Sequence, residues 1–138
     1  MSEPGPLLDT STLSEVMRNR DQGVQHEARS YLDAHERFTF SILTRFEILR
    51  GLHAKSARRQ IESFEALCSI SSIVDLEDPI VVRASVLYGL LHSAGSLIDD
   101  VDLLIAATAL ELDVPVITEN RRHFERIPNL QVESWRTP

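Results

Sequence analysis

Short apolar runs alternate with longer stretches of helical periodicity along the whole chain. Apolar, β-branched or aromatic runs predict strands at residues 6–8, 37–42, 71–76, 113–118 and 130–135, the last of them as an edge strand. The run at 71–76 has the weakest pattern of the five. Apolar residues at helical spacing predict helices over about 10–18, 25–35, 42–52, 57–69, 79–92 and 101–112, and a short helical turn over 120–127.

Glycine and proline positions indicate where some of these helices begin and end. Gly51 predicts the end of the helix that starts near residue 42. Asp78 followed by Pro79 predicts a helix N-cap with proline at the first helical position, and Gly95 predicts the end of that helix. Regular alternation of helices and short strands is typical of the α/β class. We therefore expect an α/β sandwich with a mostly parallel central sheet of about four to five short strands.

Chain length and composition are those of a single soluble domain. The 138 residues are enough for one hydrophobic core, and we expect one domain over residues 1–138 with 1–5 flexible. The longest apolar stretch is too short to cross a bilayer, and the N-terminus lacks the features of a signal peptide. With Cys68 as its one cysteine, the chain cannot form an internal disulfide. We expect a cytoplasmic protein, with Cys68 in the core.

The balance of charge limits how this chain can meet nucleic acid. Its formal net charge of −7 argues against loose, sequence-independent adhesion to a polyanion. All of its basic residues except Lys55 are arginines, whose planar guanidinium groups suit bidentate contacts with phosphate or carboxylate. An acidic chain of this kind needs a local arginine patch, a divalent cation or both to engage a nucleic acid.

Polar residues follow or precede the predicted strands at four places. Asp9 follows the first strand, Glu47 lies in the helix after the second, Asn120 follows the strand at 113–118, and Asp102 begins the helix leading into that strand. The carboxyl ends of parallel strands meet at one edge of a sheet, so these side chains are expected to converge there.

Crowded carboxylates need compensation. Asp99, Asp100 and Asp102 lie next to an apolar run, where mutual repulsion and burial would destabilise the fold. A Mg²⁺ or Mn²⁺ ion, which prefers hard oxygen ligands, would satisfy them. Such an ion is well suited to phosphate chemistry, because it polarises a phosphoryl oxygen and lowers the pKa of an attacking water.

Helix capping explains each of these acids separately. Asp9 has the position of an N-cap, and Asp99, Asp100 and Asp102 have positions that favour a helix N-terminus through its dipole. Thr44 and Glu47 fit the capping box T-x-x-E, in which Glu47 would bond the Thr44 backbone. The joint placement after successive strands is what favours a shared site, and both interpretations remain open at this point.

Four segments in order give the chain a family resemblance: "LLDTSTLSEVMR", "SILTRFEILRGL", "DLLIAATALELDVPVITENRRHF" and "IPNLQVESW". They resemble the PIN-domain ribonucleases, specifically the VapC-type toxins of bacterial VapBC toxin–antitoxin modules, over nearly the whole chain. The resemblance implies a single PIN domain and a Mg²⁺- or Mn²⁺-dependent endoribonuclease that leaves a 5′-phosphate and a 3′-hydroxyl. It also implies a VapB-type antitoxin partner, a homodimer or a higher assembly, no membrane association, and DNA contact through the antitoxin alone.

Residue by residue, the resemblance assigns the same polar positions. Asp9, Glu47 and Asp102 match the three family acids, which imply metal binding, and Asn120 matches a fourth catalytic position that orients a water or a ligand. Asp99 and Glu119 are expected as second-tier metal positions, and the family pattern leaves open whether Glu119 or Asn120 faces the metal.

This chain departs from the family pattern at Ser11, where the family usually has asparagine. Four arginines that flank Glu47 and Asn120 are candidates for RNA phosphate or antitoxin contacts: Arg45, Arg50, Arg121 and Arg122. The five histidines lack metal-ligand spacing among themselves, so none is assigned to the site; His123 is expected to help position the turn after Asn120.

Other activities fit the sequence less well. A phosphatase of the haloacid-dehalogenase type would need a second acid where Ser11 stands, and a receiver-type signalling domain would need a late lysine that this chain lacks. The alternative from another class is a PIN-fold subunit without catalysis, which binds partners or regulates. Growth arrest on expression, and its loss in Asp102→Asn, distinguishes that alternative from a nuclease.

Overall fold

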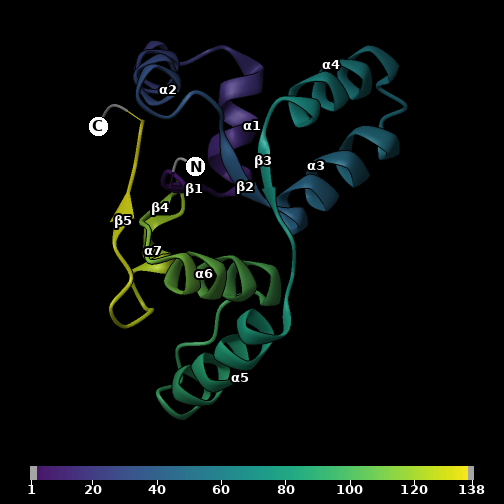
Figure 1. The fold of residues 1–138 in the computed structure, drawn as a ribbon. Helices are drawn as coiled ribbons and strands as arrows, with labels where there is room; N and C mark the ends of the chain where they lie inside the picture. The colour runs from purple at the N-terminus through teal and green to yellow at the C-terminus, as the bar shows by residue number, and fades with distance from the viewer. Residues whose placement is uncertain (1–2, 137–138) are drawn as a thin grey trace.

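The computed structural model describes residues 3–136 and contains one five-stranded sheet (Figure 1). Its strands are β1 (Leu7–Leu8), β2 (Thr39–Ser41), β3 (Ser72–Val74), β4 (Val116–Ile117) and β5 (Val132–Glu133). They lie in the order β3-β2-β1-β4-β5, and every neighbouring pair is parallel. The five predicted strands are confirmed, including the weakly patterned β3 and the edge strand β5. Residues 1–2, part of the segment expected to be flexible, lie outside the described residues.

Helices cover both faces of the sheet. They are α1 (Thr10–Arg18), α2 (Gln22–His35), α3 (Ile42–Ala54), α4 (Arg58–Ser69), α5 (Asp78–Ser93), α6 (Asp100–Leu112) and α7 (Arg121–Phe124). Figure 1 shows α1–α4 on one side of the strands and α5 with α6 on the other. The α/β sandwich expected from the sequence is confirmed, and its parallel connections run through helices as such sheets require.

Two hydrophobic clusters fill the space between the layers, because neighbouring side chains on a strand point to opposite faces. Leu7 and Val116 join the cluster under α5 and α6, whereas Leu8 and Ile117 join the cluster under α1, α2 and α4. All four are fully or almost fully buried. Cys68 is buried in the second cluster, as expected from its helical spacing.

Several helix boundaries differ from the predictions by one to three residues, among them the start of the second helix at Gln22 rather than near residue 25. The third helix continues through Gly51 to Ala54 and ends where Ser56 takes a positive φ of 53°. Glycine is tolerated inside a helix, so Gly51 was a misleading stop signal. The fifth helix starts at Asp78 itself, with Glu77 as the preceding cap residue. Gly95 does follow the end of this helix, with a φ of 66° that favours glycine. Within residues 3–136, every helix is too short or too polar to span a bilayer.

Candidate active site

The polar residues predicted to converge are carried by the carboxyl-terminal edge of the three central strands. Asp9 directly follows β1, Glu47 lies in α3 directly after β2, and Asn120 lies three residues after β4 ends. Asp102 lies in the first turn of α6, the helix that leads to β4. Since β2, β1 and β4 are adjacent and parallel, their ends meet at one edge.

Asp9 is the most constrained of these residues. Its side chain is buried, and its Oδ1 accepts hydrogen bonds from the Thr12 backbone amide (2.9 Å) and the Ser11 hydroxyl (2.7 Å). Oδ2 accepts a 2.5 Å bond from the Thr118 hydroxyl, which comes from the end of β4. Asp9 therefore does cap α1, as one interpretation of the sequence held, and its carboxylate also ties α1 to the neighbouring strand.

Asp9 and Asp102 interact electrostatically. Burial raises the pKa of the Asp9 carboxyl above its ordinary value, the three hydrogen bonds oppose this, and the charge of Asp102 adds to the rise. Burial also raises the pKa of Asp102, with further contributions from the charges of Asp99 and Glu47 and an opposing one from His123. Three carboxylates, those of Asp9, Asp99 and Glu47, are thus close enough to Asp102 for repulsion, the situation in which a divalent cation would be stabilising.

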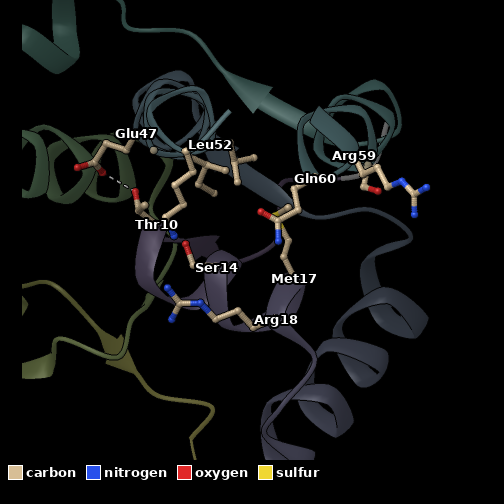
Figure 2. A pocket seen from close by; sticks show the side chains of 12 residues that line it. Thr10, Ser14, Met17, Arg18, Glu47, Leu52, Arg59 and Gln60 are labelled. Carbon is tan, nitrogen blue, oxygen red and sulfur yellow. Dashed lines mark hydrogen bonds between the residues drawn. The ribbon is translucent and has the colours of Figure 1, made fainter. Parts of the chain in front are cut away.

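Glu47 reaches toward α1 and does not cap its own helix. Its Oε1 accepts a 2.5 Å hydrogen bond from the Thr10 hydroxyl, and Figure 2 shows these two side chains pointing toward one another. The capping box expected from T-x-x-E is wrong, because Ser41 caps α3 and Thr44 lies inside the helix. The buried Thr44 hydroxyl instead lies 3.1 Å from the hydroxyl of Thr10.

Glu119 and Asn120 both follow the end of β4, and the contacts of the Glu119 side chain lie toward the end of the chain. The Glu119 carboxylate lies 3.3 Å from the Ser134 hydroxyl and 3.6 Å from the Arg136 guanidinium, near the end of the chain. Its Oε1 is buried and has no hydrogen-bond partner among the described residues. The Asn120 backbone amide donates to the Thr118 hydroxyl (2.8 Å), and Asn120 immediately precedes α7.

Ser11 connects Asp9, at the end of β1, to the loop that follows β4. Besides donating to Asp9, its hydroxyl accepts a 3.0 Å bond from the Glu119 backbone amide. The serine that departs from the family pattern therefore still joins the first acid to the loop after β4.

The candidate arginines have different neighbours. Arg50 lies 3.6 Å from the Glu47 carboxylate, while Arg45 pairs with Glu65 on α4. Arg121 pairs with Glu125 within the turn that follows Asn120, and Arg122 is exposed. Of these four arginines, Arg50 is thus the one that contacts a candidate site carboxylate.

Histidine 123 is a site neighbour that the sequence analysis missed. Its Nδ1 lies 3.3 Å from Oδ2 of Asp102, so its place at the site reflects contact with a carboxylate rather than metal-ligand spacing. The adjacent "HF" after Asn120 was the available signal, but it predicted packing of the turn alone. Thr118, which holds Asp9, and Thr10, which holds Glu47, were also missed.

The donor set fits a hard divalent cation by chemistry. Carboxylate oxygens are the ligands that Mg²⁺ and Mn²⁺ prefer, and repulsion from other carboxylates contributes to the raised pKa values of Asp9 and Asp102. Within residues 3–136, however, no three Asp, Glu, His or Cys side chains are already arranged to hold a metal ion. Glu47 and Asp102, each 18% exposed, are together with the buried Asp9 the residues that could hold such an ion.

A groove opens from this site between α1, α3 and α4 (Figure 2). It has a volume of about 390 Å³ and begins at Thr10 and Glu47. Met17 from α1 and Leu52 from α3 give it an apolar lining, whereas Lys55 and Arg59 add positive charge. Gly51, which lies inside α3 and not at its end, also lines the groove, and a side chain added at this position would project into open space.

Comparison with known proteins gives consistent matches. The PIN domain family model matches residues 7–130. Ribonuclease VapC1 of Methanocaldococcus jannaschii is 33% identical over 122 residues, covering 88% of this chain and 79% of that protein. Ribonuclease VapC19 of Mycobacterium tuberculosis is 36% identical over 125 residues, covering 91% and 96%. The solved structure of VapBC-1 from nontypeable Haemophilus influenzae superposes with a TM-score of 0.82 at 27% identity, covering 94% of this chain and 96% of that one.

Proposed function

Because this chain belongs to the PIN-domain family, among the VapC ribonucleases, we propose that it is the endoribonuclease toxin of a VapBC-type module. The observation that carries the proposal is the placement of two carboxylates from distant segments: Asp9 directly follows the central strand β1, and Asp102 lies in the first turn of α6, near enough for its charge to contribute to the raised pKa of Asp9. Burial and mutual repulsion are costly unless the pair serves a purpose such as cation binding.

Asp9, Glu47 and Asp102 are the proposed ligands of a Mg²⁺ or Mn²⁺ ion. The chemistry that such an ion supplies is activation of a water for attack at phosphorus and neutralisation of the charge that develops there. Asp9 serves as the fixed ligand because three donors hold it. Asn120 orients the water or a ligand. Asp99 and Glu119 are proposed to act at a second tier, Asp99 through its charge on Asp102.

RNA is the proposed substrate, cut to leave a 5′-phosphate and a 3′-hydroxyl. Arg50 is the best placed of the candidate phosphate contacts, because it already lies beside Glu47. Arg121 and Arg122 flank Asn120 on α7 and are exposed. Arg45 is engaged by Glu65, which makes it the weakest of the four candidates. A substrate of this kind places the proposed site of action in the cytoplasm.

A VapB-type antitoxin is the proposed partner, since the matching H. influenzae structure is of VapBC-1. The groove in Figure 2 supports this, because it leads from an apolar lining to the Glu47 carboxylate. A basic antitoxin side chain would be attracted to the carboxylates at its end. We further propose that the toxin forms a homodimer or a higher assembly with the antitoxin, and that it meets DNA through the antitoxin alone.

Cleavage of RNA by the purified, antitoxin-free protein tests the proposal. The wild type is expected to cut total RNA at defined positions in Mg²⁺, and EDTA is expected to stop it reversibly. Asp102→Asn should lower the rate by about 100-fold or more, because loss of a metal-binding charge removes several kcal/mol of transition-state stabilisation. The matched control is Asp100→Asn, an exposed neighbour in the same helical turn, which should cut like the wild type.

Equal behaviour of the three proteins would contradict the proposal. If the wild type, Asp102→Asn and Asp100→Asn are all inert on RNA yet bind the antitoxin, the chain is a partner-binding subunit without catalysis. If the wild type hydrolyses a phosphate monoester in Mg²⁺ but spares RNA, a phosphatase-like hydrolase replaces the nuclease.

A further inference from the structure

Phe46 is exposed in a chain that buries its other phenylalanines. Phe38, Phe40, Phe64 and Phe124 are 0–4% exposed, whereas Phe46 is 55% exposed. It lies on α3 immediately before Glu47, so the exposed ring belongs to the helix that supplies a proposed metal ligand. One exposed aromatic residue is unremarkable by its exposure alone, and its neighbours are what give it meaning.

Arg50 connects this ring to the proposed site. Its guanidinium carbon lies 5.2 Å from the centre of the Phe46 ring, a cation–π contact, and its Nη2 lies 3.6 Å from the Glu47 carboxylate. The ring is therefore one side chain away from the carboxylate. The base and the phosphate of one nucleotide are separated only by a sugar, so a base on the ring would bring its phosphate near Arg50 and Glu47.

The surroundings of Phe46 favour a nucleic-acid base over an apolar protein surface. Arg50 and His53, four and seven residues after Phe46, are exposed and polar, whereas the apolar neighbours at helical spacing, Ile42, Leu43 and Leu49, are partly buried and offer less surface to a partner. The core of a protein–protein interface is depleted in charge, whereas sites for unpaired bases combine aromatic rings with arginine planes. One ring, one guanidinium and one imidazole on a single helix face match the second pattern.

We propose that Phe46 and Arg50 form a base-stacking platform that selects single-stranded RNA, with an unpaired base on the Phe46 ring beside the phosphate to be cut. This rests on the proposed ribonuclease function. A base inside a duplex has both faces stacked on its neighbours, so it has no face to offer the ring. Arg50, which now covers the ring, either forms the second side of the stack or moves to the phosphate.

Steady-state cleavage of a short RNA that contains the mapped cut site tests the platform. Phe46→Leu keeps an apolar side chain but removes the π face, and it is expected to raise KM about tenfold while kcat changes much less. Phe46→Trp is expected to restore the wild-type KM. The same RNA annealed to its complement should be a poor substrate for the wild type, and the preference for single strands should shrink in Phe46→Leu.

Two further measurements separate the outcomes. Binding of a fluorescent single-stranded RNA to Asp102→Asn protein should weaken about tenfold when Phe46→Leu is added, which reports stacking without cleavage. Wild-type KM and RNA affinity in the leucine variant would overturn the platform and leave the nuclease intact, provided that Asp102→Asn still abolishes cutting. An unchanged KM with altered oligomeric mass or antitoxin affinity would assign the ring to a protein interface instead. An inert wild type would overturn both proposals.

Discussion

The two halves of the proposed site are built differently. On one side, Asp9 is buried and three donors hold its two oxygens in place. On the other side, Glu47 and Asp102 are 18% exposed, and Asp102 has a single side-chain contact, with His123 at 3.3 Å. Asp9 follows the central strand β1, whose backbone is fixed by β2 and β4, whereas Asp102 begins a helix at the edge of the sheet.

This difference indicates a division of labour. Asp9 holds its carboxylate in one position, whereas the Glu47 and Asp102 side chains have room to adjust to a bound ion or ligand. It also explains why the acids are coupled in charge although no three of them in residues 3–136 are arranged as ready metal ligands. Catalytic geometry would then depend on both halves, but folding stability only on the first.

Alanine substitution gives the largest expected contrast between the halves. Asp9→Ala removes a helix cap and leaves buried donors from Thr12 and Thr118 unpaired, so we expect a loss of about 2–4 kcal/mol in unfolding free energy. Asp102→Ala removes a partly exposed, repelled charge and should change it by at most about 0.5 kcal/mol. Urea denaturation in EDTA measures both, and both variants should be inactive. Similar losses in the two variants would show that the halves are equally constrained.

The donors to the carboxylates give a smaller contrast. Thr118 is buried, and its hydroxyl donates to Asp9 and accepts from the Asn120 amide. Thr118→Val removes this hydroxyl, so we expect a loss of about 1–2 kcal/mol in unfolding free energy. Thr10→Val, at the partly exposed Glu47, should cost no more than about 0.5 kcal/mol. Thr118→Ser keeps the hydroxyl and serves as the control. If Thr10→Val proves the more costly change, Glu47 is held as firmly as Asp9.

Sequence patterns predicted this architecture because its causes are local. Alternating and helical periodicities predicted all five strands and every helix to within a few residues. Because the strands are parallel, the sequence also predicted that Asp9, Glu47 and Asn120 lie at one edge of the sheet. Glycine was the weak signal: Gly51 predicted a helix end but lies inside α3 and lines the groove.

What could not be predicted depends on side-chain directions and distant contacts. Thr118 reaches Asp9 across 109 positions of sequence, and no pattern reports such a bond. Glu47 matched a local capping box but bonds Thr10 on another helix, because the turn of α3 that carries it faces α1. The contacts of Glu119 with Ser134 and Arg136 could not be predicted either, because the regular strand ends at Ile117 and alternation ceases to apply after it.

The pH dependence of stability offers a third contrast, measured without metal. Because the pKa of Asp9 is raised, chiefly by burial, the folded state binds this proton more tightly than the unfolded state does. The contribution of Asp9 to the unfolding free energy should therefore fall as pH rises from the ordinary aspartate value of 3.8 through the raised one. Asp9→Asn removes this term, so it should gain stability relative to the wild type as pH increases. A difference between the two proteins that is constant with pH would contradict the raised pKa.

His123 gives the smallest expected effect and the finest test of the looser half. Its ring is 47% exposed and lies 3.3 Å from Asp102, so His123→Ala should cost at most about 0.5 kcal/mol in unfolding free energy. If this one contact orients Asp102, the variant should cut RNA several-fold more slowly with an unchanged KM, and His123→Asn, which keeps a donor, should recover part of the rate. His26→Ala, at an exposed histidine of α2, is the matched control. An unchanged rate in His123→Ala would mean that Asp102 is positioned by what binds at the site and not by its contact with His123.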